Sequence, residues 1–195
     1  MNVVIISEDA KYDKFIIIPL MDRLFASIGK KRVNIIIDDY PFGRGVSQVL
    51  TKPNLRRVIA RFDYLQNVVY VLVVDRDGLD GKAGRKDRTA RIAKLLVSLA
   101  MQNLFAAAAI EELETWLLAG IFTDLPAEWN WNDIRQEVSA KEVYFEPYAK
   151  SRGFGGTPDM GRKPLGEKAS RNLAAIFVKC DEFKTLATQL KEHLS

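Results

Sequence analysis

Cysteine and histidine are almost absent from this chain of 195 residues, which contains only Cys180 and His193. A single cysteine excludes an intrachain disulfide framework, and there is no cluster of cysteine and histidine that could bind zinc. Neither residue has the companions that a Ser/His/Asp triad or a Cys/His pair requires. We therefore expect a protein of a reducing compartment, the cytoplasm, whose chemistry depends on other side chains.

Long hydrophobic runs are also missing, although 48% of the residues are hydrophobic. The apolar stretches are too short to span a bilayer, and residues 1–7 lack the basic segment that begins a signal peptide. No P-loop and no Gly-x-Gly-x-x-Gly turn follows a strand-like run, which excludes an ATPase or a dinucleotide-dependent enzyme within this chain. No membrane partner is expected.

Four short apolar runs, rich in β-branched residues or alanine, have the length of buried strands. They cover residues 3–6, 33–37, 68–74 and 104–110. The third run, VVYVLVV, is the most apolar. Continuous apolar runs that alternate with helical patterns predict an α/β fold with a parallel four-stranded sheet flanked by helices on both faces.

In the segments between these runs, apolar residues recur at the intervals of an amphipathic helix. The patterns cover 11–28, 46–62 and 87–101. Pro19 and Pro53 fall inside the first two patterns and are expected to kink them. The sheet domain is therefore assigned to residues 1–120.

The composition changes after Gly120, where tryptophan, proline and glycine become frequent. Residues 121–195 are predicted to form a helical extension packed on the sheet domain, with a mobile loop at 151–166 where the sequence is SRGFGGTPDMGRKPLG. One or two amphipathic helices are expected at 173–194.

Acidic residues follow each of the four predicted strands. They are Glu8, Asp38 with Asp39, Asp75 with Asp77, and the glutamates of 111–114. Because parallel strands leave a sheet at the same edge, side chains that follow them meet there. Crowded carboxylates repel one another unless a cation is present, and oxygen ligands select a hard ion such as Mg²⁺ or Mn²⁺. Any one of these acids could instead be an ordinary loop residue or helix cap, and Asp38 and Asp39 are interpreted in that way.

The segment VVDRDG adds a geometric argument. Side chains alternate along an extended chain, so Asp75 and Asp77 point to one side and Arg76 to the other. Glu111 and Glu114 stand three residues apart near an expected helix start, which places both on one face of that helix. The next element is expected to bury Leu113, Trp116 and Leu117.

The order of these acids resembles the Toprim domain of topoisomerases and primases, over roughly the first 120 residues. More closely, ISEDAKYDKF, the GRG of 43–45, VLVVDRDG and IEELETWLLAG resemble small stand-alone bacterial Toprim-like proteins. These are related to the nuclease domains of OLD-family and RloB-like phage-defence proteins. Their first motif is usually Glu-Gly followed by Thr-Glu or Thr-Asp, whereas this chain has Glu8-Asp9 followed by Tyr12-Asp13.

The resemblance implies a role for each acid. Glu8 would be a metal ligand or the general base, and Asp75 and Asp77 would be metal ligands. The E-x-W-L-L pattern maps onto Glu114, which is therefore preferred as the further ligand, with Glu111 kept as an additional candidate. The implied cofactor is Mg²⁺ or Mn²⁺.

Basic residues surround the same predicted edge. The candidate phosphate ligands are Arg44, Lys82, Arg85, Lys86 and Arg88. Four of them belong to the run 82–94, which a flexible loop would place next to bound metal, although such a run could also be only a solvated surface. The overall excess of four positive charges favours a polyanionic partner only weakly.

The leading hypothesis is a metal-dependent nuclease of Toprim type that acts in phage defence or DNA repair. An alternative is a catalytically degenerate Toprim-like module that binds nucleic acid or a separate ATPase of a defence complex. A third is a PIN- or NYN-like ribonuclease, against which the E-x-W-L-L segment argues. Nucleic acid is the expected partner, with DNA favoured over RNA. The sequence is also compatible with a homodimer.

Overall fold

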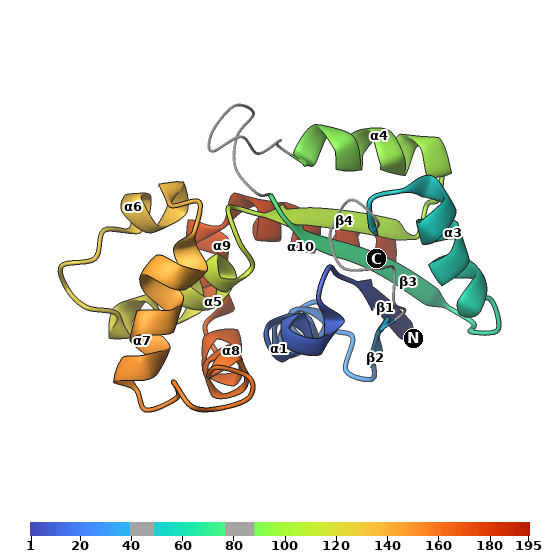
Figure 1. The fold of residues 1–195 in the computed structure, drawn as a ribbon. Coiled ribbons are helices and arrows are strands. Elements are labelled where there is room, and N and C mark those ends of the chain that lie inside the picture. Colours follow the sequence, from blue (N-terminus) through green and yellow to red (C-terminus); the bar gives the residue numbers. More distant parts are fainter. Residues whose placement is uncertain (40–48, 77–87) are drawn as a thin grey trace.

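A four-stranded parallel sheet in the order β2-β1-β3-β4 forms the centre of the molecule (Figure 1). The structure is a computed structural model that describes residues 1–39, 49–76 and 88–195. The strands are β1 (Asn2–Ile6), β2 (Asn34–Ile37), β3 (Val68–Asp75) and β4 (Leu104–Ala109). Each bound lies within one residue of its prediction. The predicted α/β fold is confirmed, and a Toprim-like arrangement is consistent with it.

The register of the strands aligns their C-terminal ends. Ile6 of β1 pairs with Leu72 of β3, and Asp75 at the end of β3 pairs with Ala109 of β4. The two residues that follow Ile6 therefore bring the chain to within one residue of the level of Asp75. This register is the reason that the acidic residues at the ends of β1 and β3 lie close together.

Helices cover the two faces of the sheet unequally. On one face lie α3 (Lys52–Arg61) and α4 (Thr89–Leu99), whose side chains pack against Tyr70, Leu72 and Val74. The opposite face packs α1 (Ala10–Ser27), α5 (Glu114–Gly120) and most of the C-terminal helices against the alternate residues of β3. Successive side chains of a strand point to opposite faces of the sheet, so each strand contributes to the hydrophobic core on both faces.

Proline at position 53 begins a helix instead of kinking one. Val49 is helical, residues 50 and 51 interrupt the helix, and α3 begins at Lys52, so Pro53 lies in the first turn of α3. Thr51 accepts a hydrogen bond from the backbone N–H of Asn54 at 3.4 Å. The first turn of a helix makes no use of the N–H that proline lacks. The predicted kink at Pro53 is therefore wrong, whereas α1 does continue through Pro19.

The C-terminal extension is helical and closely packed. Its elements are a 3₁₀ turn (Phe122–Asp124), α6 (Trp131–Gln136), the π-helix η3 (Lys141–Phe145), α7 (Glu146–Ser151), α8 (Arg162–Ser170), α9 (Leu173–Lys179) and α10 (Asp181–Leu194). The loop predicted at 151–166 is shorter than expected because α8 begins inside it, and its remaining part forms successive turns. The two helices expected at 173–194 are present.

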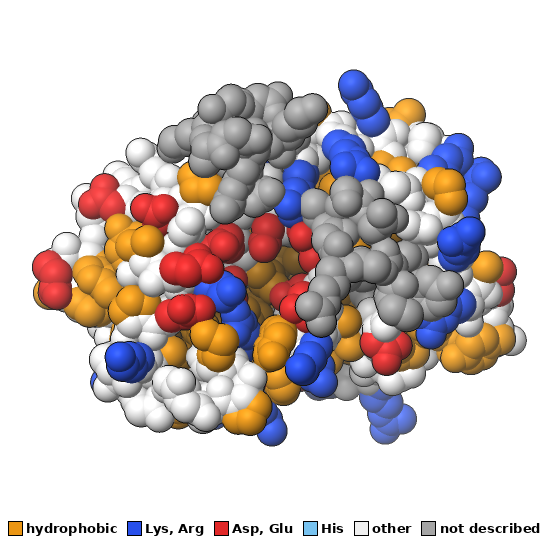
Figure 2. All heavy atoms as spheres, in the orientation of Figure 1, with side chains coloured by type: hydrophobic (Ala, Val, Ile, Leu, Met, Phe, Trp, Pro, Cys, Tyr) orange, Lys and Arg blue, Asp and Glu red, His pale blue; other side chains and the backbone are white. Residues whose placement is uncertain are grey.

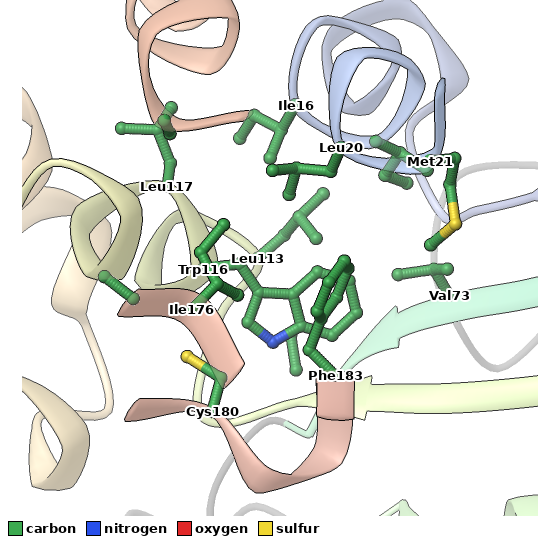
Figure 3. Close-up of a cluster of buried hydrophobic side chains, with 14 of the residues drawn as sticks. Ile16, Leu20, Met21, Val73, Leu113, Trp116, Leu117, Ile176, Cys180 and Phe183 are labelled. Atoms are coloured by element: carbon green, nitrogen blue, oxygen red, sulfur yellow. The ribbon is translucent and has the colours of Figure 1, made fainter. Parts of the chain in front are cut away.

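Trp116 of α5 lies at the centre of the core that the extension shares with the sheet (Figure 3). Its ring meets Phe183 of α10 edge to face at a centroid distance of 4.9 Å. Leu113, Trp116 and Leu117 are all buried, as predicted. No helix in the described ranges is long and apolar enough to cross a membrane.

Gly166 lets α8 approach α1 so closely that no side chain would fit. A Cβ atom there would lie 2.2 Å from the carbonyl oxygen of Phe15, which is backbone and cannot rotate away. Gly156 provides a matched control, because a Cβ there would meet nothing within 4 Å. The absence of a side chain at position 166 thus sets the distance between the two helices.

Gly166→Ala is expected to lower the free energy of unfolding by about 2 kcal/mol, although alanine favours helices over glycine by about 1 kcal/mol. Gly156→Ala is expected to change it by less than about 0.5 kcal/mol. Urea unfolding followed by circular dichroism measures both. Equal stability of the two variants would contradict the close contact.

Candidate active site

A pocket of about 330 Å³ opens at the edge of the sheet where the strands end. Its acidic lining consists of Glu8, Asp9, Asp13, Asp75, Glu112 and Glu114. Figure 2 shows red acidic side chains around a hollow near the centre of the view. Three of the predicted site residues, Glu8, Asp75 and Glu114, therefore line one pocket, from three separate elements.

Asp75 lies at the centre of this group. One of its carboxylate oxygens accepts a hydrogen bond from the backbone N–H of Leu113 at 2.8 Å, and its own N–H donates to Glu8 Oε1 at 3.1 Å. Desolvation raises the pKa of the Asp75 carboxyl well above its ordinary value, and the charges of Glu114, Glu8 and Asp13 raise it further. The pocket thus disfavours the ionised form of Asp75 unless a cation is bound beside it.

Glu8 is held by an arginine that the sequence had suggested for phosphate binding. Arg88, at the N-terminal end of α4, pairs with Glu8 Oε1 and also donates to the carbonyl oxygen of Asp75 at 3.1 Å. Arg88 is thereby anchored between the two strand ends. A phosphate bound in the pocket would compete with Glu8 for this guanidinium.

Glu114 is paired with Arg162, a residue that sequence reasoning placed in a mobile loop. The Nε and Nη2 atoms of Arg162 donate to Glu114 Oε1 at 2.9 and 2.5 Å, and both side chains are buried. The guanidinium lies over the rings of Tyr12 and Phe145, at 5.5 and 5.3 Å from their centroids. This charge is the main contribution of the C-terminal extension to the site.

Two further carboxyls in the pocket have a pKa near neutrality. Burial raises the pKa of Asp13 to about 7 against the lowering effect of a hydrogen bond from the Asp9 N–H. Burial also raises the pKa of Glu112 to about 7, although the Lys141 N–H donates to it at 2.6 Å. Sequence reasoning passed over both residues, and the only signal for Asp13 was its position in the first motif.

The turn that carries Glu112 and Glu114 is fixed from behind by Glu182 of α10. Its carboxylate accepts hydrogen bonds from the indole N–H of Trp116 at 2.8 Å, from the Ile110 N–H at 3.3 Å, and from both terminal nitrogens of Arg135. Arg135 also donates to the Ile110 carbonyl at 2.6 Å. A carboxylate paired and hydrogen-bonded in this way is a rigid support for the site.

The remaining predicted residues lie elsewhere. Glu111 pairs with Arg76 and does not line the pocket, where Glu112 takes its place. Asp38, interpreted as a loop residue, is buried and pairs with Arg61 at 2.7 Å. Five predicted residues lie outside the described ranges: Asp77, Arg44, Lys82, Arg85 and Lys86.

No protein-family model, curated protein or solved structure matches this chain. The chemistry of the pocket therefore carries the functional argument.

The donor set of the pocket suits a hard cation. Its ligands are carboxylate oxygens, and burial together with neighbouring carboxylates raises the pKa values of Asp13 and Asp75, so a bound cation would favour their ionised forms. Within residues 1–39, 49–76 and 88–195, no three acidic, histidine or cysteine side chains stand ready to hold a metal ion by themselves. Glu8 and Glu114 are each paired with an arginine, and either would have to turn away from it to reach a metal ion.

Asp13 makes stability fall as the pH rises. Its carboxyl ionises near 3.8 in the unfolded chain and near 7 in the folded protein, so between these values the folded state binds more protons. We expect wild type to lose about 2 kcal/mol more stability than Asp13→Asn between pH 5 and pH 8. The amide oxygen introduced by this substitution could still accept the hydrogen bond from the Asp9 N–H.

Urea unfolding at a series of pH values measures this difference. Asp22→Asn is the matched control, because Asp22 is exposed on the same helix. A pH profile of Asp13→Asn that parallels wild type would show that Asp13 is ionised in the folded protein.

Proposed function

We propose that this protein is a metal-dependent nuclease of Toprim type that cleaves phosphodiester bonds with Mg²⁺ or Mn²⁺. The observation that carries the proposal is the gathering of Glu8, Asp75 and Glu114 in one pocket. These three acids follow β1, β3 and β4, in the order that the Toprim resemblance implies. DNA is the proposed substrate, and phage defence or DNA repair the proposed setting.

Glu8 and Asp75, with Asp77 as the sequence predicts, would hold the ion, and Glu114 would join them. The bound ion would activate the attacking water and stabilise the leaving oxygen. The hydrogen bond from the Leu113 N–H fixes one Asp75 oxygen and so orients the carboxylate. The Arg88 side chain keeps Glu8 next to it.

The two carboxyls with a pKa of about 7, Asp13 and Glu112, are suited to proton transfer at neutral pH. A group with a pKa near the working pH is present in both forms and can accept a proton from water or return one to a leaving oxygen. Glu112 lies just before α5, two residues from Glu114, and Asp13 lines the same pocket from α1. We assign proton transfer to this pair.

Lys141 and Arg162 give the acidic pocket its positive charge. Both line it, and both come from the C-terminal extension. Anions are attracted by such cations even next to carboxylates, because charges in a partly dehydrated pocket are weakly screened. We propose that Lys141 binds a substrate phosphate, and that Arg162 does so when Glu114 turns to the metal.

A second candidate function is a binding module without catalysis. The observation in its favour is that Glu8 and Glu114 are both already paired with arginines. In that case arginine would replace the metal permanently, and the chain would serve as the nucleic-acid or ATPase-binding part of a larger complex. Metal titration separates the two candidates.

Asp75→Asn and Glu114→Gln should each reduce Mg²⁺- or Mn²⁺-dependent cleavage of labelled DNA by about 100-fold or more, because each removes a charged ligand. Chelation of the metal should abolish cleavage by wild type. Glu192→Gln, on the exposed side of α10, is the control and should be fully active.

Cleavage that survives both substitutions would refute this site. Calorimetric titration with Mn²⁺ gives a readout that does not depend on activity, since heat of binding should be lost in Asp75→Asn. If the wild-type protein binds no Mn²⁺, the result would favour the second candidate function, a binding module without catalysis.

Lys141→Met should raise KM by about tenfold and change kcat little, if Lys141 binds phosphate equally in the ground state and the transition state. Lys150→Met, an exposed lysine on the neighbouring helix α7, should leave both constants unchanged. If the two substitutions raised KM equally, the effect would come from the net charge of the protein and not from a contact of Lys141 with phosphate.

A further inference from the structure

The helices α3 and α4 carry basic residues and no acidic ones. Between positions 49 and 62 and between 88 and 100 there is no aspartate or glutamate, but seven cations are present: Lys52, Arg56, Arg57, Arg61, Arg88, Arg91 and Lys94. Without these seven, the chain has 22 basic residues against 25 acidic ones. The positive excess of the whole chain therefore comes from these two helices.

The two helices form one continuous surface. Both pack on the same face of the sheet, α3 through Leu55 and Val58 and α4 through Ile92 and Leu95. Lys52 Nζ donates to the Ser98 carbonyl of α4 at 2.5 Å, which ties the helices together. We call the surface formed by these seven cations the basic face; Arg88 lies at its edge, where its side chain turns towards Glu8.

Several cations of the basic face point to solvent. Arg56 and Arg57 of α3 and Lys94 of α4 are exposed, and none of them has an acidic partner in the described part of the chain. Figure 2 shows blue side chains over the region of α3 and α4, on the same side of the molecule as the red patch of the pocket. Unpaired like charges repel, so such a surface is stabilised by a polyanion.

We propose that the basic face binds the phosphate backbone of a nucleic acid and leads it to the acidic pocket. Arg88 forms the junction, because it belongs to the basic face and also contacts Glu8 and Asp75. Five of the seven cations are arginines, whose planar guanidinium matches phosphate oxygens in pairs. Contacts of this kind supply affinity without recognising sequence.

A lipid surface fits this face less well. Val97 is the single large apolar side chain exposed on α3 and α4, whereas a helix that lies in a membrane interface presents a row of them. The choice of nucleic acid among polyanions rests on the proposed function of the neighbouring pocket. Binding by the basic face, however, requires no cleavage.

The test is the double variant Arg56→Glu/Arg57→Glu in the full chain. Lys184→Glu/Lys191→Glu is the matched control: it makes the same change in net charge at exposed positions of α10, on the opposite face of the sheet. Fluorescence anisotropy measures the Kd for labelled duplex DNA over a salt series, with EDTA present so that no metal-dependent cleavage occurs. Urea unfolding verifies that both variants are folded.

The Kd of the α3 variant should rise by about tenfold or more, and its slope of log K against log salt should decrease by about 2, one for each lost phosphate contact. The control should change Kd by about twofold or less. Arg56→Gln/Arg57→Gln should give an intermediate Kd, so that the effect follows charge even if the Glu variant folds poorly.

An equal loss of DNA affinity in the α3 variant and in the control would overturn the proposal. A wild-type protein that does not bind DNA would also overturn it. Binding to vesicles containing phosphatidylserine in place of DNA would overturn the choice of nucleic acid. Cleavage assays separate this inference from the proposed function. DNA binding that depends on α3 without cleavage refutes only the nuclease, and cleavage with DNA affinity indifferent to α3 refutes only the basic face.

Discussion

The ion pair between Glu114 and Arg162 is the interaction on which the arrangement of the molecule depends. A carboxylate buried at the end of the sheet requires a partner, because an unpaired charge in the interior costs several kcal/mol. Arg162 can reach it only if α8 packs tightly on α1 and α5, and Gly166 and Gly120 remove the side chains that would prevent this. The electrostatics of the site thus dictate the packing of the C-terminal helices.

The same dependence extends to the supports of the site. Glu182 on α10 and Arg135 on α6 hold the Ile110 backbone and Trp116, and so fix the turn from which Glu112 and Glu114 project. The acids come from the sheet domain, whereas Arg162 and Lys141 in the pocket and the supports Glu182 and Arg135 come from the extension. A boundary at residue 120 between a sheet domain and an extension would separate the pocket acids from Arg162, Glu182 and Arg135.

The sequence predicted the strands well because buried parallel strands are continuous apolar runs, and the acids Glu8 and Asp75 followed from strand ends that share one edge. Arg162, Lys141 and Asp13 could not be predicted in the same way. Their place in the pocket depends on how helices pack, and a charged residue in a glycine-rich segment or on a helix carries no local sign of burial. Pro53 was misplaced because a proline at a helix start and one inside a helix differ only in where the helix begins.

The position of Arg162 late in the chain has a consequence for synthesis. A ribosome makes the strands and their carboxylates first, and the arginine that neutralises Glu114 is added only after α7. A nascent chain that has reached α5 carries a cluster of mutually repelling acids and an uncovered Trp116. The acidic pocket can therefore be completed only after α8 has been made, well after the strands whose ends carry its carboxylates.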